Sequence, residues 1–200
     1  MAEPIVFYFE FASPYGYFAS RQIDELAESF DRTVQWRPVM LGAMMKQTGA
    51  RPLFDLPLKA DYARQDIPRF ARFLGVPLAM PSVLPMNSLA SSRAYYWLLD
   101  NMPEQAHRVA QAFFHAHWGE GRDLSPPEIV ADVAAEAGVD RETLLAGIGS
   151  PEIKARLRGE TERAMERGVF GSPFFLVDGQ PFWGADRIPQ IRSWLERGGW

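Results

Sequence analysis

The stretch YFEFASPYGYFAS, residues 8–20, joins a predicted strand to a predicted helix. An apolar run stops at Ala12, and Ser13-Pro14 then supplies a favoured helix N-cap and a favoured first helical residue. The first turn contains no Asp or Glu, so no side chain offsets the partial positive charge of the helix N-terminus. Gly16 also leaves room for a ligand to approach. A helix end of this kind can bind an anion.

Two other Ser-Pro pairs provide a comparison within the same chain. Ser125 and Ser150 also precede predicted helices, but Glu128 and Glu152 stand in the first turns of those helices. Residues 125–128 have the pattern of a capping box between Ser125 and Glu128. Of the three predicted helices that follow a Ser-Pro pair, only the one after Ser13 has no acid in its first turn. Ser13 still has an ordinary structural interpretation as an N-cap, and a further signal is needed to assign it a function.

The pattern along the chain predicts an α/β protein with a thioredoxin-like fold. Strands are expected at residues 4–10 and 34–39, with a helix at 14–30 between them. Near the end, Asp178-Gly179 predicts a hairpin, and a last helix is expected at 187–197. The stretch between these ends is helical, with a helix that starts at Asn87 or Ser88. We therefore expect a thioredoxin-like domain from residues 1–40 and 168–200, and an inserted α-helical domain at 41–167.

Composition excludes several functions. The 200 residues include no cysteine, which rules out a disulfide oxidoreductase and a thiolate side chain. The net charge of −4 argues against a nucleic-acid partner. The apolar runs fall short of the about 18 residues that a membrane span needs, so we expect no membrane partner. The first residues do not have the pattern of a secretion signal, and a cytoplasmic location is expected.

Metal chemistry is not expected either. The chain has three histidines, and His115 and His117 would point to different faces of a helix. With no cysteine available, the remaining ligands are few.

A second signal lies near the C-terminus, where Ser172-Pro173 separates GVFG from the predicted strand FFLV. Together, FYFEFASPYGYFAS, LPLKADYARQD and GVFGSPFFLVDGQPFWGADRI resemble the 2-hydroxychromene-2-carboxylate isomerase family. This family is close to the kappa-class glutathione transferases and belongs to the DsbA-like thioredoxin superfamily. The resemblance covers nearly the whole chain.

The resemblance implies a glutathione-dependent isomerase. Ser13 would stand where disulfide-exchanging relatives have the first cysteine of Cys-x-x-Cys, and it would be the catalytic residue that holds the thiolate of bound glutathione. Ser172 would precede a cis-proline, Pro173, and pair its backbone with the cysteinyl group of glutathione. Trp183 and Gly184 would also bind glutathione, with Ala185 and Asp186 at its γ-glutamyl end and Lys59 at its glycine carboxylate. Phe182 is expected to belong to the core.

The substrate implied by the resemblance is an aromatic 2-oxo acid, as in the breakdown of naphthalene-like compounds. Lys46, Asn87 and Arg51 would contact it, and Arg51 is also a candidate for the glycine carboxylate of glutathione. Taken alone, Lys46 is typical of a solvated helix end and Asn87 of a helix cap, and Asp186 is equally typical of an N-cap. Where the family often has Gly-Asn, this chain has Gly49-Ala50, which removes one polar contact. The family also implies a homodimer.

Two other functions are compatible with the same residues. A kappa-like glutathione transferase would use the same site but consume glutathione. A non-catalytic thioredoxin-like module would bind a peptide or a small thiol at Ser172-Pro173 without turnover. In the isomerase, a thiolate would add to the substrate, a double bond would become rotatable, and elimination would return the thiol, giving cis/trans isomerisation and ring opening to a benzylidenepyruvate.

Overall fold

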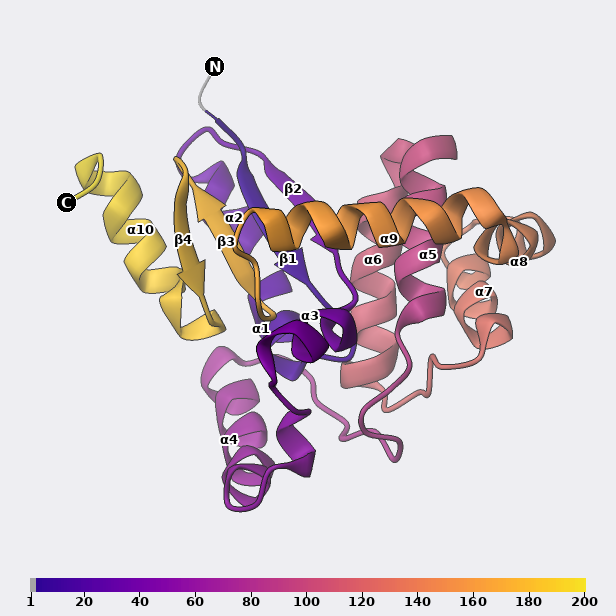
Figure 1. The fold of residues 1–200 in the computed structure, drawn as a ribbon, viewed down its shortest axis with the longest axis horizontal. Helices are drawn as coiled ribbons and strands as arrows, with labels where there is room; N and C mark the ends of the chain where they lie inside the picture. The colour runs from indigo at the N-terminus through magenta and orange to yellow at the C-terminus, as the bar shows by residue number, and fades with distance from the viewer. Residues whose placement is uncertain (1–2) are drawn as a thin grey trace.

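The computed structural model describes residues 3–200 and contains a mixed sheet surrounded by helices (Figure 1). The strands are β1 (Ile5–Phe9), β2 (Val34–Pro38), β3 (Phe174–Val177) and β4 (Gln180–Trp183). The α-helices are α1 (Pro14–Ser20), α2 (Ile23–Glu28), α3 (Leu41–Thr48), α4 (Lys59–Leu74), α5 (Leu89–Asn101), α6 (Pro103–Phe114), α7 (Pro127–Glu136), α8 (Arg141–Gly149), α9 (Pro151–Glu166) and α10 (Ile188–Arg197). Short 3-10 helices η1 (Leu53–Asp55) and η3 (Ala185–Arg187) and a π-helix η2 (His115–Gly119) complete the order.

The sheet has the strand order β2-β1-β3-β4, with β1 parallel to β2 and antiparallel to β3. The hairpin between β3 and β4 turns at Asp178 and Gly179, whose φ angles of 51° and 76° are those of a two-residue turn with a strong twist. The β-α-β start and the β-β-α end therefore meet in one sheet, and the expected thioredoxin-like fold is confirmed.

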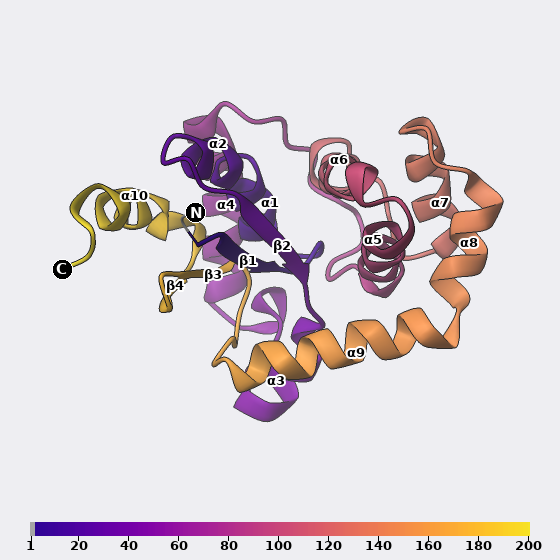
Figure 2. The same ribbon diagram turned by 90° about the horizontal axis from the view of Figure 1, so that it is seen from above.

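The central strand β1 buries side chains on both faces of the sheet. Phe7 and Phe9 are fully buried on the side of the aromatic core, and Phe7 stacks on Phe175 with ring centroids 5.3 Å apart. Tyr8 points to the other face, where it packs with Met44 of α3 and Ala164 of α9. Figure 2 shows the same division, with α1 and α2 on one side of the sheet and α3 and α9 on the other.

The inserted helices are attached to the carboxyl ends of β1 and β2 by buried side-chain donors. On α5, the Tyr95 and Tyr96 hydroxyls donate to Trp36 O and Pro38 O at 3.0 and 2.9 Å. On η2, the Trp118 indole N–H donates to Phe11 O at 2.9 Å. A buried carbonyl left without a donor costs about 1–3 kcal/mol, so each bond favours this placement of the helices.

Two expectations about helix boundaries were wrong. The helix expected at residues 14–30 is broken at Gln22, whose side-chain amide donates to Phe18 O at 2.9 Å while its backbone N–H bonds to Ala19 O. The expected capping box at Ser125 is absent, because α7 begins after Pro126 and the Ser125 hydroxyl donates to Asp123 at 2.6 Å instead.

Candidate functional site

Ser13 lies at the start of α1 and makes two hydrogen bonds through its hydroxyl group. Its oxygen accepts the Gly16 N–H at 3.0 Å, as an N-cap does, and its proton is donated to Ser172 O at 3.2 Å. The side chain is nearly buried, with 8% of the residue exposed. The first turn of α1 contains no acidic residue, as expected. In residues 3–200, no acceptor lies in hydrogen-bonding geometry to the Tyr15 N–H.

Ser172 joins this helix start to the sheet. The Ser172–Pro173 peptide bond is cis, and the Ser172 hydroxyl accepts the Glu10 N–H at 2.9 Å. Within the described chain, the Ser172 N–H has no acceptor, so one edge of this extended segment is open for pairing. Gly16 was expected to leave room for a ligand. It leaves room for Ser172, because an added Cβ would lie 3.1 Å from the Ser172 Oγ.

The segment after β4 runs beside the cis-proline. The Gly184 N–H donates to Pro173 O at 3.1 Å, and the φ of 115° at Gly184 suits only glycine. Ala185 is buried, whereas the Asp186 carboxylate is 62% exposed and lies 3.1 Å from the Arg187 guanidinium. The backbone therefore brings Gly184, which precedes Ala185 and Asp186, into contact with Pro173.

Aromatic side chains form the exposed wall next to this segment. Trp183 is 55% exposed and packs edge-on against Phe170, with ring centroids 4.9 Å apart. Phe170 is 44% exposed. Phe182 points away from this wall and packs against Trp194 of α10, which agrees with its expected role in the core.

The three basic candidates lie on or between α3 and α4. Lys46 is in the last turn of α3, Arg51 follows in the connecting loop, and Lys59 is the first residue of α4. All three are exposed. Arg51 donates to Asp55 O at 3.2 Å, whereas Lys46 and Lys59 form no ion pair within residues 3–200. The ammonium groups of the two lysines are therefore available to an anionic ligand.

Asn87 is exposed and stands next to the N-cap position of α5. Its side-chain oxygen accepts the Leu89 N–H at 3.2 Å, and its own N–H donates to Ser125 Oγ at 3.1 Å. The oxygen thus has the local role expected of a cap, and the side-chain amide N–H groups remain available.

Two acidic residues lie near the site that the sequence analysis did not predict to be there. Glu10 is partly buried, its backbone carbonyl accepts the Ser13 N–H at 3.0 Å, and its carboxyl group accepts hydrogen bonds from Ser88 Oγ at 2.5 Å and Leu41 N–H at 3.1 Å. Burial raises the pKa of Glu10 to about 7, although both hydrogen bonds to the carboxyl group oppose the rise. The sequence does contain a signal for Glu10, which is the lone acid inside the apolar run IVFYFEFA. An acid that is buried with such a run needs hydrogen-bonding or charged partners.

Asp66 of α4 is the second acid. Its carboxylate accepts the Tyr15 hydroxyl at 2.7 Å, the Tyr62 hydroxyl at 3.1 Å and an Arg69 N–H at 2.6 Å. Burial alone would raise the pKa of Asp66, but these hydrogen bonds outweigh it and hold the pKa below its usual value. Tyr15 follows Ser13-Pro14, so this network fixes α4, with Lys59 at its start, against the site.

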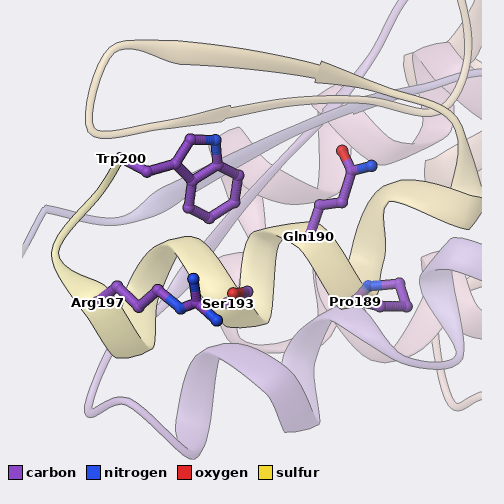
Figure 3. A pocket seen from close by; sticks show the side chains of 5 residues that line it. All are labelled: Pro189, Gln190, Ser193, Arg197 and Trp200. Atoms are coloured by element: carbon purple, nitrogen blue, oxygen red, sulfur yellow. The ribbon is translucent and has the colours of Figure 1, made fainter.

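A surface hollow lies along α10, and the candidate site residues described above do not line it. This hollow of about 540 Å³ is lined by Pro189, Gln190, Ser193, Arg197 and Trp200 (Figure 3). Residues 3–200 contain no group of His, Asp and Glu side chains arranged to hold a metal ion. No helix in the same range is long and apolar enough to cross a membrane.

Known proteins match the chain along nearly its whole length. The family model described as a DSBA-like thioredoxin domain matches residues 4–196. A 2-hydroxychromene-2-carboxylate isomerase of Pseudomonas putida is 30% identical over 193 residues, which cover 96% of this chain and 93% of the relative. Glutathione S-transferase kappa 1 of Homo sapiens is 26% identical over 200 residues, covering 94% and 88%.

A solved structure gives the same relationship. The structure of a 2-hydroxychromene-2-carboxylate isomerase matches with a TM-score of 0.88 at 29% identity, over 96% of this chain and 94% of that one. The sequence resemblance is therefore confirmed at the level of the family. By its matched length and its fold, the chain belongs to the DSBA-like thioredoxin family.

Proposed function

We propose that the chain is a glutathione-dependent isomerase of the 2-hydroxychromene-2-carboxylate type. The observation that carries the proposal is the pair formed by Ser13 and the open backbone edge of Ser172 at the cis-proline, in a chain without cysteine. The similarity to isomerases along nearly the full length supports it. A thiol needed at this site has to come from a bound molecule.

The residues around Ser172 fit a small peptide. An extended peptide can pair with an unpaired backbone edge, and the Ser172 N–H has no acceptor in the described chain. The exposed Asp186 carboxylate suits the α-ammonium of a γ-glutamyl group, and the exposed Lys59 suits the glycine carboxylate. Glutathione held in this way would supply a thiolate that adds to the substrate and leaves again.

Ser13 would stabilise that thiolate. Lowering the pKa of a thiol from about 8.5 to about 6.5 requires about 2.7 kcal/mol of preferential stabilisation of the anion. The Ser13 hydroxyl can turn its proton from Ser172 O to a sulfur anion, and the Tyr15 N–H offers a second donor. Hydrogen bonds to an ionised group are worth about 1.5–3 kcal/mol each, so these two donors are of the required size.

The substrate side would accept an aromatic 2-oxo acid. Trp183 and Phe170 present an exposed aromatic wall beside the thiol site. Lys46 would bind the carboxylate of the substrate, with Arg51 as a further cation and the Asn87 amide as a donor to an oxygen. Each of these assignments can be tested by a single substitution.

The decisive experiment follows 2-hydroxychromene-2-carboxylate by absorbance, with and without glutathione. We expect turnover that requires glutathione but does not consume it, and a loss of about 100-fold or more in Ser13→Ala. Ser150→Ala is the matched control, because Ser150 is also an N-cap before proline and accepts the Ile153 N–H at 3.2 Å. Ser150→Ala should lose about as much unfolding free energy as Ser13→Ala does, and it should keep the full activity.

A kappa-like transferase remains the second candidate, because human glutathione S-transferase kappa 1 matches over 94% of the chain. Consumption of glutathione in proportion to product would favour it. A chain that binds glutathione without any reaction, and whose affinity for glutathione does not change in Ser13→Ala, would be a binding module. This outcome would contradict both enzymatic functions.

A further inference from the structure

Glu10 is an acidic side chain that the proposed chemistry does not use. It follows β1 directly, and its carboxyl group accepts hydrogen bonds from Ser88 Oγ at 2.5 Å and Leu41 N–H at 3.1 Å. Leu41 is the first residue of α3, and Ser88 is the N-cap residue of α5. One carboxyl group therefore joins the end of the central strand to the starts of two helices.

The start of α3 has no side-chain cap from its own flank, whereas at the start of α5 the side-chain oxygen of Asn87 accepts the Leu89 N–H. The N-cap residues Met40 and Ser88 make no side-chain capping bond. The first N–H groups of a helix have no partner within the helix, and a negative charge near them is favourable. Glu10 Oε2 supplies that acceptor to Leu41 from another element, so it acts as a long-range cap of α3.

The backbone of Glu10 contacts the thiol side of the site at the same time. Its N–H donates to Ser172 Oγ at 2.9 Å, and its carbonyl accepts the Ser13 N–H at 3.0 Å. On the other side, α3 carries Lys46, and Asn87 immediately precedes Ser88. Glu10 thus lies between the residues proposed to hold glutathione and those proposed to contact the substrate.

We propose that Glu10 is a positioning residue whose carboxyl group fixes the starts of α3 and α5, and with them Lys46 and Asn87, relative to the Ser13–Ser172 site. The part of this role that concerns substrate placement rests on the proposed function. The structural part, the attachment of α3 and α5 to β1, is independent of it.

The chemistry of the two partners defines the informative substitutions. The Leu41 N–H can only donate, whereas the Ser88 hydroxyl can donate or accept. A glutamine at position 10 can therefore keep both contacts, with its oxygen toward Leu41 and its amide N–H toward Ser88. An alanine removes both contacts and leaves the Leu41 N–H without its acceptor. Glu10→Gln and Glu10→Ala thus separate the loss of charge from the loss of attachment.

Hydrogen exchange tests the attachment without any ligand. In Glu10→Ala, amides of residues 41–48 should exchange about tenfold faster, while those of residues 151–166 change little. Glu10→Gln should stay within about threefold of the wild type, and Ser88→Ala should fall between them. A uniform acceleration along the chain in Glu10→Ala, or unchanged exchange in residues 41–48, would overturn the proposal.

Steady-state kinetics and binding test the placement of the substrate. The KM for 2-hydroxychromene-2-carboxylate should rise about tenfold in Glu10→Ala, while the affinity for S-methylglutathione stays within about twofold. Glu10→Gln should restore the KM. An equal loss of both affinities would refute a role in placement. If the wild type does not turn over this substrate, the proposed function fails, and the exchange data still decide whether Glu10 attaches α3 and α5.

Discussion

Replacing Glu10 by glutamine is expected to change how the stability of the fold depends on pH. Desolvation raises the pKa of the carboxyl group from 4.5 to about 7, and hydrogen bonds from Ser88 and Leu41 lower it by less. The folded chain therefore keeps the proton to a higher pH than the unfolded chain does. For such a group, the stabilising contribution is full below the unfolded pKa and is lost as the pH rises through the folded one.

The size of the effect follows from the two pKa values. At about 1.36 kcal/mol per pH unit, a rise from 4.5 to about 7 corresponds to about 3 kcal/mol. Most of this loss of unfolding free energy occurs between pH 5 and pH 8. Partial access of solvent to Glu10 reduces the loss to about 2 kcal/mol. A glutamine at position 10 has no charge anywhere in this pH range, and it keeps both hydrogen-bond partners. The wild type should therefore lose about 2 kcal/mol relative to Glu10→Gln over this range.

Urea unfolding followed by circular dichroism at pH 5, 6, 7 and 8 measures this difference. The slope of unfolding free energy against urea should be the same in both proteins, so that a shift of the midpoint reports stability alone. Glu162→Gln is the control, because Glu162 is an exposed residue of α9. It should follow the wild type at every pH. Parallel curves for the wild type and Glu10→Gln would refute the assignment of a raised pKa to Glu10.

Gly16→Ala should lower the unfolding free energy by about 1–3 kcal/mol, because the new Cβ would lie 3.1 Å from Ser172 Oγ. Gly42→Ala should instead raise it by up to about 1 kcal/mol, since no atom lies within 4 Å of a Cβ at this helical position. Equal effects in urea unfolding would contradict the packing argument. Tyr15→Phe removes the 2.7 Å bond to Asp66 and should lower the unfolding free energy by about 1 kcal/mol, and an unchanged thermal midpoint would count against the network.

The elements that local sequence determines were predictable. The turn at Asp178-Gly179 adopts the positive φ angles that favour these residues, and the apolar runs on either side form β3 and β4. The Ser13 and Ser150 caps are present because each hydroxyl needs only an N–H three residues later. These features depend on neighbours in the chain, which a sequence displays directly.

The features that were missed depend on partners far away in the sequence. Ser125 has the pattern of a cap, but its hydroxyl accepts the Asn87 N–H from another loop. Glu10 pairs with Leu41 and with Ser88, 31 and 78 residues further on. The first turn of the helix after Ser13 contains no acid. The acid near Ser13 is Glu10, which directly follows β1 on the other side of Ser13 in the chain.

Glu10 also changes the electrostatic argument for the thiol site. A carboxylate near a thiolate disfavours the second negative charge. Because burial raises the pKa of Glu10 to about 7, the carboxyl group is largely neutral below that pH and opposes the thiolate little. The same desolvation that makes an ionised Glu10 unfavourable therefore makes its presence compatible with an anion at Ser13.

The two bonds of the Ser13 hydroxyl explain how one side chain can serve both the fold and the proposed chemistry. The Gly16 N–H uses a lone pair of the oxygen, whereas the proton is donated to Ser172 O at a long 3.2 Å. In the proposed complex, a peptide paired with the Ser172 backbone competes for that carbonyl, and its sulfur anion offers a stronger acceptor. The proton can then turn to the sulfur by rotation about one bond while the cap on α1 stays intact. Alanine at position 13 loses both roles and alanine at position 150 only the first, so the difference between the two variants isolates the contribution of the donor to the reaction.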